Sequence, residues 1–231
     1  MIKWVYQWDF RKSRKDYEDK MMFGFKDLEE KRQAIEEIIG LEWNMFQQVQ
    51  NQGGRAGCQD DYSTFHLMRA CQFSVWNDFM LKSYRKDLLD ARGAGRNLLT
   101  EKYAYMMEVT DPQYFSQVLK DRLPVISAEN MNIIDEITWY LMDCEREKAA
   151  KYPRLTASGR KTYSGSEDGS FASVETYLRG ELKTYSGETL RYYLEYVRVN
   201  RAQGVNLTLK VLEQMVLAYG YKSLEDAESK M

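Results

Sequence analysis

The sequence predicts an all-α protein built as a single multi-helix globular domain. Only three prolines occur in 231 residues, which leaves long stretches free of the residue that breaks helices most strongly. Alternating β-branched runs bounded by tight turns, the pattern of β-strands, are almost absent. Apolar residues instead recur three and four positions apart in one segment after another, which is typical of helices that pack on a shared core.

The composition fits a folded protein of the cytoplasm and excludes several other classes. Hydrophobic residues make up 44% and charged residues 29% of the chain, as in ordinary globular proteins. The net charge of −2 argues against a nucleic-acid binder, which usually carries a basic surplus. Three cysteines at unrelated spacings favour a reduced protein over a disulfide scaffold. We find neither a signal peptide nor the roughly 20 apolar residues of a membrane helix.

The chain divides into an N-terminal segment and a helical domain. Residues 1–26 combine aromatic and charged side chains. Two interpretations stay open: an N-terminal arm or helix packed by Trp4, Trp8 and Phe10, and a partly ordered extension. Residues 27–231 form the all-α domain.

Two helices open this domain. Asp27 is an N-cap followed by two acidic residues in the first turn, and the glycine-rich segment 51–57 ends the helix that starts there. The next helix is predicted as one piece over about 63–91, ended by Gly93. Because its first half is apolar on nearly every face, we expect it to be a buried central helix.

Capping signals place the remaining helices. Asp111 precedes a proline suited to the first helical turn, Ser127 opens a long helix that ends before Pro153, and Ser223 begins a short last helix. A polar loop is expected at about 153–172. The other predicted helices cover 96–109, 173–185, 187–203 and 206–219, and the one from Asp111 reaches about residue 119.

Glu42 is the sharpest departure from the helical pattern, because it lies inside an apolar stripe. A carboxylate there is paired with a buried arginine, is a functional acid, base or ligand anchor, or is turned to solvent by a helix bend at Gly40. Arg69 and Gln72 interrupt the stripe of the following helix in the same way. Buried arginine meets a carboxylate, a phosphate or a ligand, so Arg69 is either the partner of Glu42 or an anion contact.

Two glycine-containing loops carry weaker signals. The segment 51–57 places Arg55 and several backbone N–H groups before a helix, and Gly93 to Asn97 does the same with Arg96. The first segment lacks the lysine and hydroxyl residue of a P-loop. Together they suggest a site for a small anionic or polar molecule, rimmed by Arg55 and Arg96 and floored by Glu42, Arg69 and Gln72.

Metal and covalent chemistry find little support. His66 is the only histidine, and one histidine with scattered cysteines does not make a zinc site. Asp60 and Asp61 could meet Glu101 and Glu136 around a cation, but they are more simply helix N-terminal carboxylates. No serine, histidine and acid spacing supports a covalent hydrolase, so we predict no metal and no cofactor.

Several long runs resemble an uncharacterised bacterial family, the domain of unknown function 4125. They are EWNMFQQVQNQGGRAGCQDDYSTFHLMR at 42–69, SYRKDLLDARGAGRNLLTEKYAYMM at 83–107, KYPRLTASGR at 151–160 and ETYLRGELKTYSGETL at 175–190. The resemblance covers about residues 28 to 200 and implies a family without a known substrate or catalytic residue. The polar residues singled out above fall within these runs, together with Glu181, which lies on an apolar face.

The leading hypothesis is a buried polar pocket for a small polar or anionic ligand, with catalysis left open. Glu42 is the candidate acid, base or anchor. A carboxylate in an apolar wall has a raised pKa unless it is paired, and a neighbouring arginine opposes that shift. The candidate ligand-binding residues are Arg55, Gln59, Asp60, Arg69, Gln72, Arg96, Asn97, Glu101, Lys102 and Glu181.

The alternative is a non-enzymatic interaction or regulatory module in which the same residues form a structural network. Its partner protein would bind the tyrosine-rich region 185–200, which holds Tyr185, Tyr192, Tyr193 and Tyr196. Because the basic surplus is missing, these rings are not interpreted as an RNA platform. A third hypothesis, a helical domain that accompanies a toxin or a nucleotidyltransferase, predicts co-purification with a partner chain.

Overall fold

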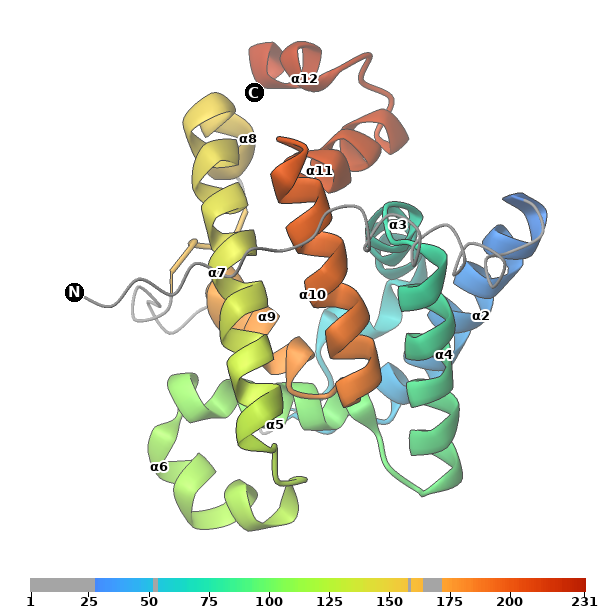
Figure 1. Cartoon of the computed structure of the whole chain (residues 1–231), viewed down its shortest axis with the longest axis vertical. Coiled ribbons are helices and arrows are strands. Elements are labelled where there is room, and N and C mark those ends of the chain that lie inside the picture. The colour runs from blue at the N-terminus through green and yellow to red at the C-terminus, as the bar shows by residue number, and fades with distance from the viewer. Residues whose placement is uncertain (1–27, 52–53, 158, 164–171) are drawn as a thin grey trace.

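Helices make up nearly all regular structure in the computed structural model, which describes residues 28–51, 54–157, 159–163 and 172–231 (Figure 1). The predicted all-α class is confirmed, since the described residues form eleven α-helices and no strand. The α-helices are α2 (Leu28–Gln47), α3 (Tyr62–Ser74), α4 (Asp78–Gly93), α5 (Leu98–Thr110), α6 (Pro112–Tyr114), α7 (Ala128–Lys151), α8 (Pro153–Ala157), α9 (Val174–Leu182), α10 (Gly187–Ala202), α11 (Leu207–Ala218) and α12 (Leu224–Lys230).

Side-chain caps begin most of these helices where the sequence predicted. Ser127 accepts a hydrogen bond from the backbone of Asn130 and opens α7, and Ser223 accepts one from the backbone of Asp226 and opens α12. Such a bond satisfies a backbone N–H that the first helical turn leaves without a partner. The predictions for residues 1–26 and for the Asp27 cap lie outside the described residues.

The single helix predicted over 63–91 is wrong. The chain forms α3 and α4, which are separated at residues 75–77. The physical reason is local, because the Asn77 side chain accepts a 2.9 Å hydrogen bond from the Met80 N–H and starts a new helix there. The expectation of burial on nearly every face fails for α3 as well, since Met68 is 41% exposed.

Two further segments differ from the expectation. The helix predicted from Asp111 to residue 119 is a short α6, a π-helical turn η3 (Phe115–Leu119) and a 3-10 turn η4 (Lys120–Arg122). The polar loop predicted from residue 153 begins with a helix, α8, whose first residue is proline. Proline is favoured there because the first helical N–H has no intrahelical partner.

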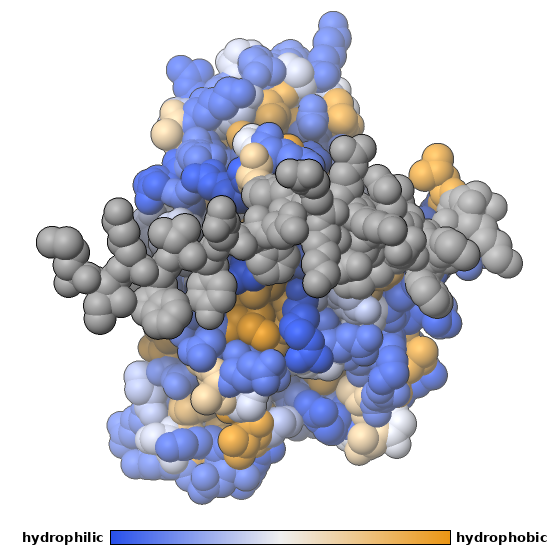
Figure 2. All heavy atoms as spheres, in the orientation of Figure 1, coloured by the Kyte–Doolittle hydropathy of each residue, from blue (hydrophilic) through white to orange (hydrophobic). Residues whose placement is uncertain are grey.

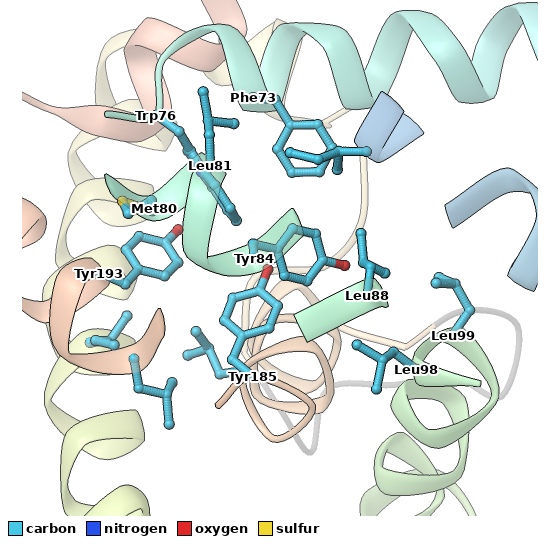
Figure 3. Close-up of a cluster of buried hydrophobic side chains, with 14 of the residues drawn as sticks. Phe73, Trp76, Met80, Leu81, Tyr84, Leu88, Leu98, Leu99, Tyr185 and Tyr193 are labelled. Carbon is cyan, nitrogen blue, oxygen red and sulfur yellow. The ribbon is translucent and has the colours of Figure 1, made fainter. Parts of the chain in front are cut away.

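The core lies where α2, α3, α4, α5, α7, α9 and α10 meet, and α7 and α10 run side by side (Figure 1). Aromatic rings dominate its centre: Trp76 contacts Phe73, Tyr84, Tyr185 and Tyr193 at centroid distances of 5.0–6.1 Å (Figure 3). A second, smaller core joins α8, α11 and α12. None of the helices that the structure describes is long and apolar enough to cross a bilayer.

Candidate functional site

A buried ionic network joins α2, α3, α5 and α9. Its first half is the Glu42–Arg69 pair, one of the alternatives that the sequence left open for these two residues. Arg69 Nε donates to Glu42 Oε2 at 2.6 Å, and Arg69 Nη2 donates to the other carboxylate oxygen. The hydroxyl of Tyr84, on α4, donates to Glu42 Oε1 at 2.6 Å. Glu42 has no exposed surface, so α2 does not turn it to solvent at Gly40.

Glu181 forms the second half of the network. It accepts hydrogen bonds from Lys102 Nζ at 2.7 Å, from the Tyr185 hydroxyl at 2.8 Å and from Gln72 Nε2 at 3.1 Å. Arg69 Nη1 and Nη2 each lie 3.3 Å from Glu181 Oε1, so one guanidinium links both carboxylates. The network therefore connects residues 112 positions apart.

The charges of the network balance, because two carboxylates face one guanidinium and one ammonium. Burial raises the pKa of the Glu181 carboxyl, but Arg69 and Lys102 more than offset this and hold it well below its usual range. Burial lowers the pKa of the Lys102 ammonium, and the charge of Glu181 outweighs that effect and raises it. Lys102 and Glu181 are therefore both charged at neutral pH.

The two tyrosines of the network are neutral hydrogen-bond donors. Burial, followed by the charge of the neighbouring carboxylate, raises the pKa of Tyr84 and of Tyr185 well above the usual range. Sequence analysis did not single out Tyr84 and named Tyr185 only as part of the tyrosine-rich region, because tyrosine at a core position does not interrupt an apolar stripe.

The network is closed to solvent and internally satisfied. Glu42 has three donors, and Arg69 directs its Nε, Nη1 and Nη2 atoms at Glu42, Gln72 and Glu181. Buried ion pairs of this kind need such complete partnering, because the cost of removing charges from water is otherwise not recovered. The role of Glu42 as an acid, base or ligand anchor stays a prediction, and this geometry does not favour it.

Arg55, Gln59 and Asp60 form a separate cluster at the end of α2. Gln59 is 1% exposed and donates to the backbone oxygens of Phe46 at 2.9 Å and Val49 at 3.0 Å. Arg55 Nε donates to Asp60 Oδ1 at 2.9 Å on the surface. These residues close the last turn of α2, and among the described residues no hydrogen bond or ion pair joins them to the ionic network.

Arg96, Asn97 and Glu101 form a third group, at the start of α5. Arg96 Nε donates to Glu101 Oε1 at 2.8 Å, and the Asn97 side chain caps α5 and donates to the backbone oxygen of Met45 at 2.8 Å. The predicted rim of Arg55 and Arg96 is thus not assembled around Arg69. Of the predicted site residues, the structure brings together Glu42, Arg69, Gln72, Lys102 and Glu181.

One side of the network carries cations against aromatic rings. Lys102 Nζ lies 3.6 Å from the ring centroid of Tyr177, and Arg160 Cζ lies 5.0 Å from the same centroid. Lys102 Nζ also lies 5.9 Å from the ring centroid of Tyr103, and burial raises the pKa of the Tyr103 hydroxyl to about 12. We call Lys102, Tyr103, Arg160 and Tyr177 the cation–tyrosine edge. Sequence analysis did not single out the last three, although all lie in the runs that resemble the family.

The other predicted chemical groups are engaged elsewhere. His66 Nε2 lies 2.9 Å from a carboxylate oxygen of Glu36 near the surface. In the part of the chain that the structure describes, no three histidine, cysteine or acidic residues gather closely enough to hold a metal ion. Cys58 is exposed, and Cys71 and Cys144 are buried free thiols. In the tyrosine-rich region, Tyr185 and Tyr193 are core residues.

A cleft of about 460 Å³ lies away from all these groups, between α8 and α12. It is lined by Lys151, Tyr152, Arg154, Glu225, Glu228 and Ser229. Its carboxylates already have partners, because Tyr152 donates to Glu225 and the backbone of α8 donates to Glu228.

Comparison with known proteins places the chain in a family. Neither a curated protein nor a solved structure matches it significantly. The family model described as "Protein of unknown function (DUF4125)" matches residues 32–229, a range that contains the whole ionic network and the cation–tyrosine edge. The chain therefore belongs to the DUF4125 family.

Proposed function

We propose that the protein binds a small anionic ligand at the cation–tyrosine edge, and that the ionic network behind it is the support. The observation that carries the proposal is the contact of Lys102 and Arg160 with the ring of Tyr177. Ammonium, guanidinium and phenol groups all supply the N–H or O–H donors that a phosphate or carboxylate accepts.

The hydroxyl groups of the edge support this assignment. Among the described residues, no group forms a hydrogen bond with the hydroxyl of Tyr103 or with that of Tyr177. Both side chains are half-buried, so part of each is open to solvent. Lys102 is 3% exposed and lies beneath the rings, where its charge acts in a medium of lower dielectric constant than water.

The network supplies rigidity rather than chemistry in this proposal. Glu181 fixes the Lys102 ammonium at 2.7 Å, and Arg69 and Gln72 fix Glu181 in turn. When a charged group is already held in place by its hydrogen-bond partners, reorganising it costs little free energy as a ligand binds. The predicted residues Gln72, Lys102 and Glu181 thus retain a role in ligand binding, with Gln72 and Glu181 acting through Lys102.

The test is calorimetric titration of the full chain with inorganic phosphate and with acetate, read alongside alkylation of the exposed Cys58. Cys58 is exposed, and it is one of the groups that raise the pKa of the Tyr103 hydroxyl. We expect a bound anion to slow its alkylation. Losing one charged donor should weaken binding about tenfold or more, so Arg160→Ala is expected to raise Kd by that factor. Tyr177→Phe keeps the ring and should cost less.

Arg154→Ala is the matched control, since Arg154 is an exposed arginine on the neighbouring α8. It should bind both anions like the wild type. Equal losses in Arg160→Ala and Arg154→Ala would show a nonspecific charge effect and refute the assignment. So would titrations in which neither anion binds.

Protein binding is a second candidate function, favoured by one observation. The segment formed by α6, η3 and η4 contributes no buried residue, although it carries Tyr114, Phe115, Val118 and Leu119. It projects from α5 at one end of the molecule (Figure 1), where apolar side chains reach the surface among hydrophilic ones (Figure 2). Capture of a partner by the wild type and not by Val118→Asp would support this function.

A further inference from the structure

The segment formed by α6, η3 and η4 places apolar side chains at the surface, at the end of the molecule beyond α5 (Figure 1). Phe115, Val118 and Leu119 are all half-buried. On either side of the segment, Val109 is 42% exposed and Val125 is 98% exposed. Single exposed apolar side chains are common on proteins, whereas a group of them marks a contact with another molecule.

The segment is fixed by contacts with its neighbours. Both α6 and η3 pack against α5, and the Asp111 side chain accepts a 3.1 Å hydrogen bond from the backbone of Tyr114. Beyond η4, the Tyr105 hydroxyl donates to the backbone oxygen of Pro124 at 2.7 Å. The turn η3 is π-helical, a rare form that is frequent at functional sites. A surface that is held in place before binding loses little conformational entropy when a partner covers it.

Charges of both signs lie beside the apolar side chains. Lys120, Asp121 and Arg122 are exposed, and among the described residues no hydrogen bond or ion pair engages their side chains. Glu108 and Asp111 lie before the apolar residues, so residues 108–123 carry three acidic and two basic side chains. Nucleic acids and anionic lipids attract a basic surplus, which is missing here. The charges instead fit a protein surface that also carries both signs.

We propose that this segment is the interface of a symmetric dimer, in which it contacts the same segment of a second copy of the chain. The inference rests on the second candidate function, protein binding through this segment, and does not depend on the anion site. Every contact of a two-fold interface occurs twice, because residue i of one copy meets residue j of the other and j meets i. Two adjacent side chains of opposite charge without partners suit this symmetry: Lys120 pairs with Asp121 of the second copy, and Asp121 with its Lys120.

The apolar and the charged side chains have different parts in this dimer. Covering Phe115, Val118 and Leu119 removes apolar surface from water, and this is the main driving force of association. Exposed ion pairs at the rim of an interface add little affinity, but they suppress wrong orientations and fix the register. The apolar residues therefore hold the two copies together, and Lys120 and Asp121 orient them.

Analytical ultracentrifugation of the full chain over a range of concentrations tests the apolar contact. We expect the wild type to reach twice the mass of one chain as its concentration rises. Val118→Asp brings a charge into the apolar contact and should raise the dimer Kd about tenfold or more. Leu217→Asp is the matched control, because Leu217 is 46% exposed on α11. It should dimerise like the wild type.

Exchanging the charges tests the two-fold symmetry. Lys120→Glu alone sets carboxylates opposite carboxylates, and Asp121→Lys alone sets ammonium groups opposite each other, so each variant should dimerise about tenfold more weakly. An equimolar mixture of the two variants should dimerise like the wild type, because both pairs of the mixed dimer join opposite charges. Lys210→Glu, at an exposed lysine of α11, is the control and should have no effect.

The outcomes separate the inference from the function on which it rests. A wild type that stays monomeric at every concentration would overturn the dimer. Protein binding would still stand if the segment then captured a different protein through Val118. A dimer that neither Val118→Asp nor the charge variants weaken lies on another surface, which also overturns the inference. So does a mixture of Lys120→Glu and Asp121→Lys that stays as weak as each variant alone, since the reciprocal pair is then absent.

Discussion

Replacing Arg69 by methionine tests the buried network directly. Methionine fills much of the volume of the arginine stem but cannot donate a hydrogen bond. The substitution would leave Glu42, which has no exposed surface, with the Tyr84 hydroxyl as its remaining hydrogen-bond donor. Glu181 would keep Lys102. The variant therefore isolates the cost of one buried carboxylate without a cation.

The expected loss follows from burial. Removing one partner of a buried ion pair costs about 3–5 kcal/mol. For a chain of this length each kcal/mol lowers Tm by about 2–4 °C, so we expect a fall of roughly 6–20 °C. The matched control is Arg85→Met, which breaks a two-bond arginine–glutamate pair between α4 and α2. That pair is exposed, with Arg85 and Glu37 side chains at 42% and 43%, and is worth about 0–1 kcal/mol.

Urea unfolding followed by circular dichroism measures both variants, and a double variant sharpens the result. Arg69→Met with Glu42→Gln leaves no uncompensated charge at that position, so it should be more stable than Arg69→Met alone. If Arg69→Met costs no more than Arg85→Met, the pair is not a buried ionic contact and the reasoning fails. The same conclusion follows if the double variant is the less stable one.

Three further predictions concern stability. Gly180→Ala should destabilise the protein by about 1–3 kcal/mol, because the new Cβ would lie 2.9 Å from the Lys102 backbone oxygen. Gly40→Ala has open space around it in α2 and should instead stabilise the protein by about 0.5–1 kcal/mol. The check is that the two variants shift the melting temperature in opposite directions. Glu181→Gln should destabilise at neutral pH. Because the folded-state pKa of Glu181 is lowered, its contribution to the free energy of unfolding is complete above the unfolded pKa of about 4.3. This contribution is lost as the pH falls from there toward the folded pKa. A stability difference between the wild type and Glu181→Gln that stays constant down to pH ~2 would contradict this. Gln59→Ala should cost about 1–3 kcal/mol in chemical unfolding, because the Val49 backbone oxygen loses the Gln59 donor and the Phe46 oxygen keeps only the Val49 N–H. A loss below about 0.5 kcal/mol would refute this prediction.

Local signals predicted most of the fold. Helix starts such as those at Ser127 and Ser223 depend on one side chain and a backbone N–H three residues away, so they are readable from short windows. The break between α3 and α4 was missed because the apolar pattern continues through it. A single cap at Asn77 outweighed the apolar pattern. Since a cap is worth only about 0.5–2 kcal/mol, little energy decides a helix boundary.

The candidate site was predictable only in its polar members. Glu42, Arg69 and Glu181 interrupt apolar stripes, and a buried charge needs a partner. Tyr84 and Tyr185 gave no such signal, because their rings suit the core and only the position of the hydroxyl reveals their role. Arg55 and Arg96 suggested a rim because glycine-rich turns lie beside them, but each found a nearby carboxylate.

The sequence by itself determined the helical class, most helix starts and the positions of two charges, Glu42 and Arg69, that need partners when buried, because each depends on periodicity, caps or the cost of a buried charge. Only the tertiary structure decided that Glu181, 112 residues from Arg69, completes the network. It also decided that Lys102 and Arg160 meet at one ring. These pairings depend on how α3, α5 and α9 cross, and crossing geometry comes from packing over the whole core rather than from any local stretch of chain.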